Sequence, residues 1–448
     1  MTAALLAHEP HRPADVLLRD VRVLDPRAGL DARQDVRVHR GEVAELGAPR
    51  TLPAEAQEEL IEGDGALLVP AFFDPHVHLR TPGQEHKEDL NTGTRAAAAG
   101  GYGGVLAMPN TDPVLDSAPL LRSLEDAATR QARVPVGFLA AITKGLQGEQ
   151  LTEMAELREV GALGFTDDGL PVQSAGMLRK ALQYQRLCGG VIALHEEDRT
   201  LSRGGSMHEG PVSAALGLGG IPTVSESTMV ARDAALAGYE RARVHFQHLS
   251  CADSVEAVAD AKARGWRVSA EVTPHHLLLT DEDVRGMDTR MKISPPLASE
   301  EDRRALVEGL RSGTIDCVAT DHAPHARDEK EVPFEQAPMG TTGLETAFAA
   351  LYSGLVRGGE LELELLITRM TAGAELFDLP APTIAPGQPA NMTLIDLDAA
   401  WIAGEHGWQS RSENCCFAGR RLSGRVLTTL AAGAIVHREQ ALAPMAVR

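Results

Sequence analysis

Residues 66–80 read ALLVPAFFDPHVHLR, an apolar run that ends in two histidines separated by a single residue. Successive side chains of a strand point to opposite faces, so His76 and His78 share one face with Asp74 and Arg80. Two imidazoles on one face at the end of an apolar strand, flanked by an acid and an arginine, favour a metal site. The alternative is a pair of ordinary core or surface histidines, and this stretch alone leaves that alternative open.

The same kind of stretch recurs along the chain between residues 68 and 320. A short, β-rich apolar run is followed by a loop with polar residues and then by an Ala-rich helical segment. The eight runs are LLVPAFFDPHVH, GGVLAMPNT, VGFLAAITK, ALGFTDDG, VIALHEED, RVHFQHLS, RVSAEVTPHH and DCVATDHAP. Eight strands that alternate with helices predict a (β/α)8 TIM-like barrel of the α/β class, and they fit it better than an open doubly wound sheet.

Polar side chains stand at the carboxyl end of every run. They are His76 and His78, Asn110, Lys144, Asp168, His195, His248, His275 and Asp321. The active site of a barrel lies at the carboxyl ends of its strands. We therefore expect these side chains to gather at one mouth of the barrel.

The two ends of the chain carry a different pattern. Residues 14–66 and 388–437 contain short alternating strands separated by turns. This pattern predicts one small β-sandwich assembled from both chain ends. We expect residues 1–67 and 387–448 to form that β-sandwich domain and residues 68–386 to form the barrel.

Composition limits the class of protein. The chain has 448 residues, of which 43% are hydrophobic and only 4% aromatic, and this suits a large, tightly packed α/β core. The formal net charge of −20 disfavours binding to nucleic acid or to an anionic membrane. No stretch has the roughly 18 apolar residues of a membrane helix, and no basic region precedes the short apolar run at the amino terminus, as a secretory signal requires. The five cysteines lack paired metal spacing and indicate reduced thiols of a cytoplasmic protein.

The candidate ligands are too many for one tetrahedral ion. Four imidazoles and two carboxylates suit two ions that share a bridging ligand, and zinc is the metal we expect, although manganese or cobalt accepts the same donors. The expected ligands are His76, His78 and Asp321 for one ion, His195 and His248 for the other, and Asp168 with a water as the bridge. A water between two dications loses its proton near neutral pH, and Asp321 can take that proton as a general base and return it to a leaving group.

Longer phrases extend these motifs over the whole barrel. They include DPHVHLRTPGQEHKEDLNTGTRAAAAGGY, MPNTDPV, GFTDDGLPV, LHEEDRTL, QHLS, EVTPHHLLLT and ATDHAPH, with weaker likeness in NMTLIDLD and GRVLTTLAAGAIV. Together they resemble the dihydroorotases of the amidohydrolase superfamily, in the branch whose bridging ligand is an aspartate. The resemblance implies a zinc-dependent, reversible cyclisation of N-carbamoyl-L-aspartate to L-dihydroorotate in de novo pyrimidine (UMP) biosynthesis.

Both of these compounds carry a carboxylate that takes no part in the ring chemistry. Arg80 lies on the histidine face, and a guanidinium can hold a carboxylate with two hydrogen bonds. The resemblance implies that Asn110 and His325 contact the same carboxylate. The competing interpretations are a surface salt bridge for Arg80 and a turn residue for Asn110.

The chain departs from the usual pattern of this branch at some substrate positions. KISPPL stands where KVNPPL is usual, so Ser294 replaces an asparagine that contacts substrate and reaches less far than it. RTPG stands for REPG, and QAPMG stands for APFG. The resemblance places Pro338, Met339 and Gly340 of this last phrase at the substrate.

Two other functions stay open. Allantoinases and hydantoinases share the paired histidines but act on neutral rings and differ after the pair, so Arg80 favours a carboxylated substrate. Some dihydroorotase-like chains are inactive scaffolds that support aspartate transcarbamoylase and have lost metal residues, whereas every expected ligand is present here. We expect a small-molecule substrate and a homo-oligomer as partners, and an aspartate transcarbamoylase complex is left open.

Overall fold

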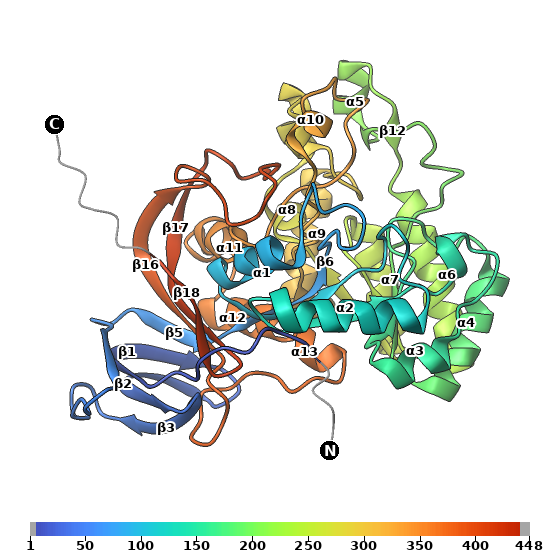
Figure 1. Cartoon of the computed structure of the whole chain (residues 1–448). Coiled ribbons are helices and arrows are strands. Elements are labelled where there is room, and N and C mark those ends of the chain that lie inside the picture. Colours follow the sequence, from blue (N-terminus) through green and yellow to red (C-terminus); the bar gives the residue numbers. More distant parts are fainter. Residues whose placement is uncertain (1–5, 440–448) are drawn as a thin grey trace.

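The computed structural model describes residues 6–439, in which two large sheets divide the chain (Figure 1). One sheet forms the barrel, and the other gathers strands from both ends of the chain. Residues 1–5 and 440–448, the outer ends of the two segments expected to form the small β-domain, lie outside the described residues. Residues 1–5 are also the start of the stretch in which we expect no secretory signal.

The barrel sheet has eight strands that pair in chain order. They are β6 (Phe72–Val77), β7 (Tyr102–Ala107), β8 (Val136–Ala140), β9 (Gly164–Phe165), β10 (Val191–Leu194), β13 (Val244–Phe246), β14 (Val268–Val272) and β15 (Cys317–Val318). All neighbouring strands are parallel. A parallel bridge from Val77 to His322, with a 2.9 Å hydrogen bond from the His78 N–H to the His322 carbonyl, joins the first strand to the segment after the last. The predicted (β/α)8 barrel is thereby confirmed.

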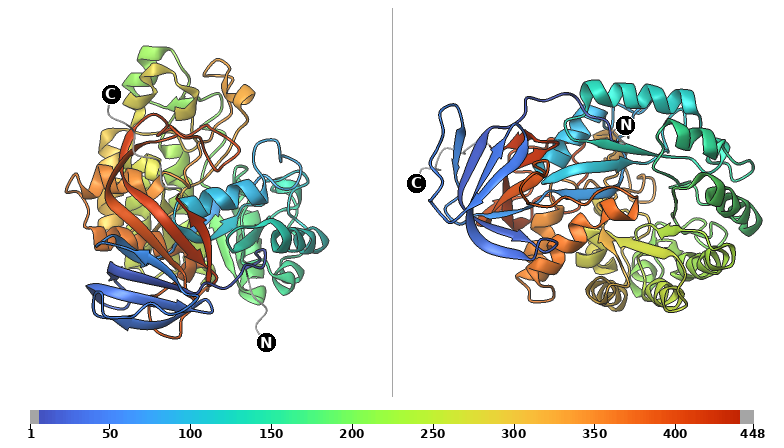
Figure 2. Two further views of the ribbon diagram at one scale, coloured as in Figure 1. Left: turned by 60° about the vertical axis from the view of Figure 1, so that its left-hand side comes forward. Right: turned by 90° about the horizontal axis from the view of Figure 1, so that it is seen from below.

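Helices cover the outside of the barrel (Figure 2). The longer ones are α1 (Leu90–Ala99), α2 (Ala118–Gln131), α3 (Met154–Val160), α4 (Ala175–Cys188), α6 (Val224–Glu240), α7 (Ala252–Ala263), α9 (Glu300–Ser312) and α12 (Leu363–Thr371). Small residues let them pack closely: in α1 a Cβ on Gly93 would lie 2.5 Å from Leu79 Cδ2. The same helix starts at Asp89, whose side chain accepts a hydrogen bond from the Thr92 N–H and so caps the first turn.

Short elements lie in the loops between the strands and the outer helices. They are β11 (Met207–His208), β12 (Gly220–Ile221), α5 (Pro211–Leu216), α8 (Pro274–Leu278), α10 (Arg327–Lys330), α11 (Ala347–Leu351) and α13 (Gly373–Leu376). Figure 1 shows α5, β12 and α10 close together at the top of the molecule. Those three follow barrel strands, so they surround the mouth where the carboxyl ends of the strands open.

The second sheet is built from both chain ends. Its strands are β1 (Val16–Asp25), β2 (Leu30–His39), β3 (Glu42–Gly47), β4 (Glu59–Glu62), β5 (Leu67–Pro70), β16 (Met392–Ile402), β17 (Arg421–Ala431) and β18 (Ala434–Arg438). They run in the order β18-β17-β16-β5-β1-β2-β3, with β4 beside β1, and β5 pairs with β16 to join the two ends. Val16, Val43, Met392 and Leu430 share one apolar cluster. The predicted small β-domain from both ends is confirmed, and hydrogen bonds make it one continuous sheet.

The run at residues 67–78 is divided between the two sheets. We predicted a single strand there, but β5 pairs with β1 and β16 of the outer sheet, whereas β6 pairs with β7 of the barrel. Ala71 stands between them and donates its N–H to the Asn391 carbonyl at 3.1 Å. The apolar run is long because it crosses from one core into the other.

Two expectations from composition can be checked against the fold. Within residues 6–439, no helix combines the length and the apolar character needed to cross a membrane. All five cysteines carry free thiols, and four of them are buried.

Candidate active site

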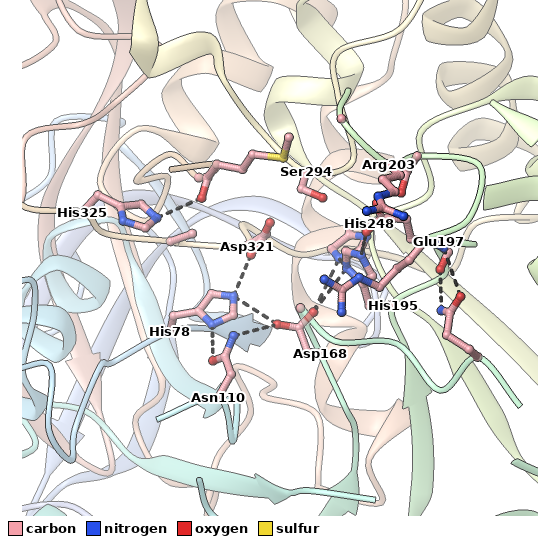
Figure 3. Close-up of a pocket in the computed structure, with 18 of the residues that line it drawn as sticks. His78, Asn110, Asp168, His195, Glu197, Arg203, His248, Ser294, Asp321 and His325 are labelled. Atoms are coloured by element: carbon pink, nitrogen blue, oxygen red, sulfur yellow. Dashed lines mark hydrogen bonds and ion pairs between the residues drawn. The ribbon is translucent and has the colours of Figure 1, made fainter. Parts of the chain in front are cut away.

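The carboxyl ends of the barrel strands bring the six predicted metal ligands together, and Figure 3 labels all of them except His76. The six are His76 and His78 at the end of β6, Asp168 after β9, His195 after β10, His248 after β13 and Asp321 after β15. All are buried, with exposed fractions of 0 to 6%. Parallel strands that close into a barrel place these ends in a ring, which is why residues so far apart in the chain meet.

One group of donors surrounds an oxygen of Asp321. His78 Nε2 lies 3.0 Å and His76 Nε2 lies 3.5 Å from Asp321 Oδ1. His76 Nε2 is fully buried and has no hydrogen-bond partner among the described residues. Because an unpaired polar atom in the interior is costly, this nitrogen fits a site that a cation completes.

A second group surrounds an oxygen of Asp168. His195 Nδ1 and His248 Nε2 lie 2.9 Å apart, and they lie 3.6 and 3.7 Å from Asp168 Oδ1. The other oxygen, Asp168 Oδ2, lies 3.4 Å from His78 Nε2. Asp168 therefore stands between the two groups, with an oxygen toward each. The donor set of buried imidazoles and shared carboxylate suits a pair of divalent cations.

Both carboxylates are ionised in this setting. Burial by itself would raise the pKa of Asp168, but the charge of His76 and hydrogen bonds with His195 and His248 hold that pKa well below its ordinary value. Burial opposes ionisation of Asp321 too, yet His76 and His78 hold its pKa below its ordinary value. The centre thus offers two negative charges to a metal.

A buried carboxylate that the sequence analysis missed orients His76. Glu271 of β14 lies with Oε1 2.7 Å from His76 Nδ1 and with Oε2 3.0 Å from His245 Nε2. Since His76 Nδ1–H donates a hydrogen bond to this carboxylate, the Nε2 lone pair faces the centre. Strand alternation could have identified Glu271 as a polar residue of the same face, because in RVSAEVT it alternates with Ser269 and Thr273.

His78 and His195 also contact polar side chains outside the two donor groups. His78 Nδ1 lies 2.8 Å from Asn110 Oδ1, and His195 Nε2 lies 3.5 Å from Glu197 Oε2. Asn110 was predicted as a substrate contact. In the structure it lines the cavity, its carbonyl oxygen accepts from His78, and its amide nitrogen lies 3.5 Å from Asp168 Oδ2. Glu197 was not singled out from the sequence, where it is one of three consecutive acids after His195.

A cavity of about 830 Å³ opens above the six ligands. The predicted substrate residues that line it are Arg80, Asn110, Ser294, His325, Met339 and Gly340, and Arg199 and Arg203 stand at its rim. Pro338 does not line the cavity, because its carbonyl turns away to accept a 2.8 Å hydrogen bond from Lys330 Nζ. Of the predicted substrate residues, only Pro338 does not line the cavity, although the next two residues, Met339 and Gly340, do.

The end of the Arg80 side chain lines the cavity and makes few contacts with the described residues. The residue is 8% exposed, and its one hydrogen bond to the described residues runs from Nε to the Pro324 carbonyl at 3.1 Å. The two terminal nitrogens are therefore left to face the cavity. A buried guanidinium with two free N–H groups is a receptor for a carboxylate.

His325 lies next to Arg80 but is committed elsewhere. Its Nε2 donates to the Met339 carbonyl at 2.9 Å, which leaves Nδ1 as an acceptor. Burial and the charge of Arg80 lower the pKa of His325 to about 3, so the imidazole is neutral. His325 is therefore bonded to the Met339 loop, and its contact with a substrate carboxylate stays a prediction.

Three residues of the site have left-handed backbone conformations. The φ angles are +56° at Arg80, +29° at His248 and +46° at Asp321. Such angles cost about 1–2 kcal/mol for residues with a Cβ, and they occur where surrounding structure enforces them. Here the chain leaves a strand and turns sharply, and the turn aims each side chain across the mouth.

Several known proteins are similar to this chain in sequence or in fold. The sequence model of a family described as Dihydro-orotase-like matches residues 65–254. Proteins named Dihydroorotase from Pelotomaculum thermopropionicum and Anaeromyxobacter dehalogenans strain 2CP-C are 44% and 46% identical to this chain, each over 95% of this chain and 99% of its own length. Among solved structures, an L-hydantoinase (dihydropyrimidinase) from Arthrobacter aurescens superimposes with a TM-score of 0.85 at 25% identity, over 96% of this chain and 98% of its own. A dihydropyrimidinase from Brevibacillus agri NCHU1002 shares the fold with a TM-score of 0.81 at 24% identity, over 95% of both chains. Since curated relatives match it along nearly its whole length, the chain belongs to the dihydroorotase family.

Proposed function

We propose that this protein is a zinc-dependent dihydroorotase, which interconverts L-dihydroorotate and N-carbamoyl-L-aspartate in pyrimidine biosynthesis. The observation that carries the proposal is that one cavity holds both a cluster of metal-ligand side chains and a guanidinium that can bind a carboxylate. A buried cluster of imidazoles and carboxylates forms its floor, and the free end of Arg80 lies in its wall. The family membership supports the same reaction, because the curated relatives are named for it.

The six ligands divide between two cations in this proposal. His76, His78 and Asp321 would hold one, His195 and His248 the other, and Asp168 would bridge both. Zinc suits these nitrogen and oxygen donors, and a pair of such ions supplies a water made acidic enough to act as the nucleophile. Glu271 keeps His76 in the tautomer whose Nε2 faces the centre, through its 2.7 Å contact with Nδ1.

Asp321 carries the proton in the proposed hydrolysis of the ring. Its carboxylate is ionised, because His76 and His78 hold its pKa low, so it can accept a proton from the attacking water. When the C–N bond of the ring breaks, the same proton goes to the departing nitrogen. The carbonyl carbon becomes a carboxylate, and ring closure runs the steps in reverse, with loss of water.

Arg80 selects the substrate in this scheme. The carboxylate on the ring remains charged throughout, so it needs a permanent cationic partner away from the reacting carbonyl. The two free nitrogens of Arg80 fit that need. Hydantoinases, which a solved neighbour represents, are named for a ring that lacks this carboxylate.

Hydrolysis of L-dihydroorotate by the purified, zinc-loaded protein tests the proposal, with hydantoin and allantoin as parallel substrates. We expect turnover of dihydroorotate and little of the other two. Turnover of hydantoin or allantoin instead would replace the proposal with a neutral-ring amidohydrolase. Activity on none of the three, with metal bound, would favour the scaffold role.

Location and partners extend the same proposal. Five free thiols suit a reducing cytoplasm, where pyrimidine synthesis would take place. A homo-oligomer and a complex with aspartate transcarbamoylase stay predictions from the resemblance. Size-exclusion chromatography of the protein alone, and of its mixture with aspartate transcarbamoylase, tests both.

A further inference from the structure

Lys330 is a buried ammonium behind the wall of the cavity. It ends α10 and is 7% exposed. Its Nζ donates to the carbonyls of Pro338 at 2.8 Å, Thr289 at 3.0 Å and Lys292 at 3.4 Å. The three N–H groups of an ammonium are therefore matched by three backbone acceptors.

These acceptors belong to two loops that lead into the cavity. Lys292 precedes Ser294, and Pro338 precedes Met339 and Gly340, all three of which line the cavity. The two loops also contact each other, since the Gly340 N–H donates to the Lys292 carbonyl at 2.8 Å. Lys330 is thus bonded to both loops at the point where they meet.

The segment that carries Lys330 is itself part of the cavity wall. It begins at His325, whose Nε2 donates to the Met339 carbonyl at 2.9 Å. Thr289 Oγ1 donates in return to the Lys330 carbonyl at 2.7 Å. Three segments of chain are therefore joined around one side chain, and each contributes a residue to the same side of the cavity.

Burying the Lys330 side chain carries a desolvation cost. Burial, aided by the nearby charge of Lys292, lowers the pKa of Lys330 to about 7. No carboxylate of the described residues lies within ion-pair distance of its Nζ, so backbone carbonyls alone offset the loss of hydration. When Lys330 is protonated, these hydrogen bonds are charge-assisted and stronger than neutral ones; the neutral amine keeps two donors toward the same carbonyls.

We propose that Lys330 is a positioning residue that holds the loops of Ser294 and Met339–Gly340 in their substrate-binding arrangement. Lys330 does not line the cavity and lies outside both donor groups of the metal centre. It therefore acts on substrate affinity and leaves the chemical step largely unchanged. The inference rests on the proposed function, because it assigns a role in binding the same substrate.

Steady-state kinetics of Lys330→Met on L-dihydroorotate test the inference. We expect KM to rise about tenfold, kcat to change by less than about threefold and the metal content to stay the same, which is the pattern of lost uniform binding. Lys262→Met is the matched control. Lys262 Nζ also makes three hydrogen bonds, to the Gly313 carbonyl and both Asp316 oxygens, at the opposite end of the barrel. That control should lower stability and leave KM unchanged.

Hydrogen–deuterium exchange of the metal-loaded protein gives a second readout that needs no turnover. Lys330→Met should speed exchange in residues 289–295 and 337–343, and Lys262→Met should not. If Lys330→Met fails to fold, Lys330→Gln keeps two neutral donors and should shift both readouts in the same direction by less.

The outcomes separate the inference from the proposed function. A KM within about twofold of the wild-type value, or unchanged exchange in both loops, would overturn the role of Lys330. A wild-type protein without activity on dihydroorotate would overturn the proposed function, and the exchange comparison would still decide whether Lys330 holds the loops.

Discussion

Replacing Arg80 with methionine removes the guanidinium and keeps most of the apolar stem. In the structure two terminal nitrogens of Arg80 are free for a ligand, and the third nitrogen bonds the Pro324 carbonyl. Hydrogen bonds to charged groups contribute about 1.5–3 kcal/mol each, so losing a two-pronged contact with the substrate carboxylate costs about 3 kcal/mol after rearrangement. Each ~1.4 kcal/mol is a factor of ten, which makes the expected loss in kcat/KM about a hundredfold.

The loss should fall mainly on KM. Arg80 holds a group that is charged in substrate and product alike, so its contact is as strong in the ground state as in the transition state. Metal content should not change, because Arg80 belongs to neither donor group. Arg203→Met is the matched control, since Arg203 lines the same cavity at its exposed rim and should cost little.

A second substrate sharpens the assay. Dihydrouracil has the same ring without the carboxylate, so Arg80→Met should leave its poor hydrolysis unchanged while that of dihydroorotate falls. An unchanged KM for dihydroorotate, or an equal loss on both substrates, would refute the assignment of Arg80 as the carboxylate receptor.

Three other changes have definite expected results. Asp321→Asn should lower kcat by more than about a hundredfold, because the amide cannot accept the proton, and should leave most of the metal bound, as elemental analysis would report. Glu271→Gln should weaken metal affinity by about 10–100-fold, measured by competition with a chelator, because His76 loses the carboxylate that orients it. Glu345 is partly buried and its pKa is raised to about 7 by desolvation, so the folded state binds its proton more tightly than the unfolded state. Stability should therefore fall as the pH rises from about 4.5 to 7. Glu345→Gln should remove that fall and raise Tm at pH 8 more than at pH 5.

Opposite results would be equally informative. Turnover of Asp321→Asn near the wild-type rate would move the proton transfer to another group. Metal affinity of Glu271→Gln equal to the wild type would mean that packing alone orients His76. A Tm difference between Glu345→Gln and the wild type that is the same at both pH values would show that the carboxyl titrates normally.

Much of the barrel and its mouth was predictable because the relevant patterns are local. Side chains alternate along a strand, so DPHVH places His76 and His78 on one face whatever surrounds them. The carboxyl ends of parallel strands open at one mouth, so a polar residue after each apolar run is expected there. All six candidate ligands meet on this basis.

The boundary between the two sheets was not predictable in the same way. Residues 67–73 are apolar without interruption, because both β5 and the start of β6 are buried. An unbroken apolar run predicts that a strand is buried, but it does not predict which of the two cores contains that strand. The pairing of β5 with β1 and β16 depends on strands from both ends of the chain.

The sequence by itself determined the barrel, the small domain from both chain ends and the six candidate ligands. Hydrophobic periodicity and the ends of strands are local features that can be recognised from consecutive residues. Only the tertiary structure decided how individual polar atoms are paired. Glu271 meets His76 across 195 positions of the chain, Lys330 reaches carbonyls of two other loops, and the N–H of His325 is taken by Met339. Hydrogen-bond partners of buried groups depend on which distant segments the fold brings within about 3 Å, and no local pattern carries that information.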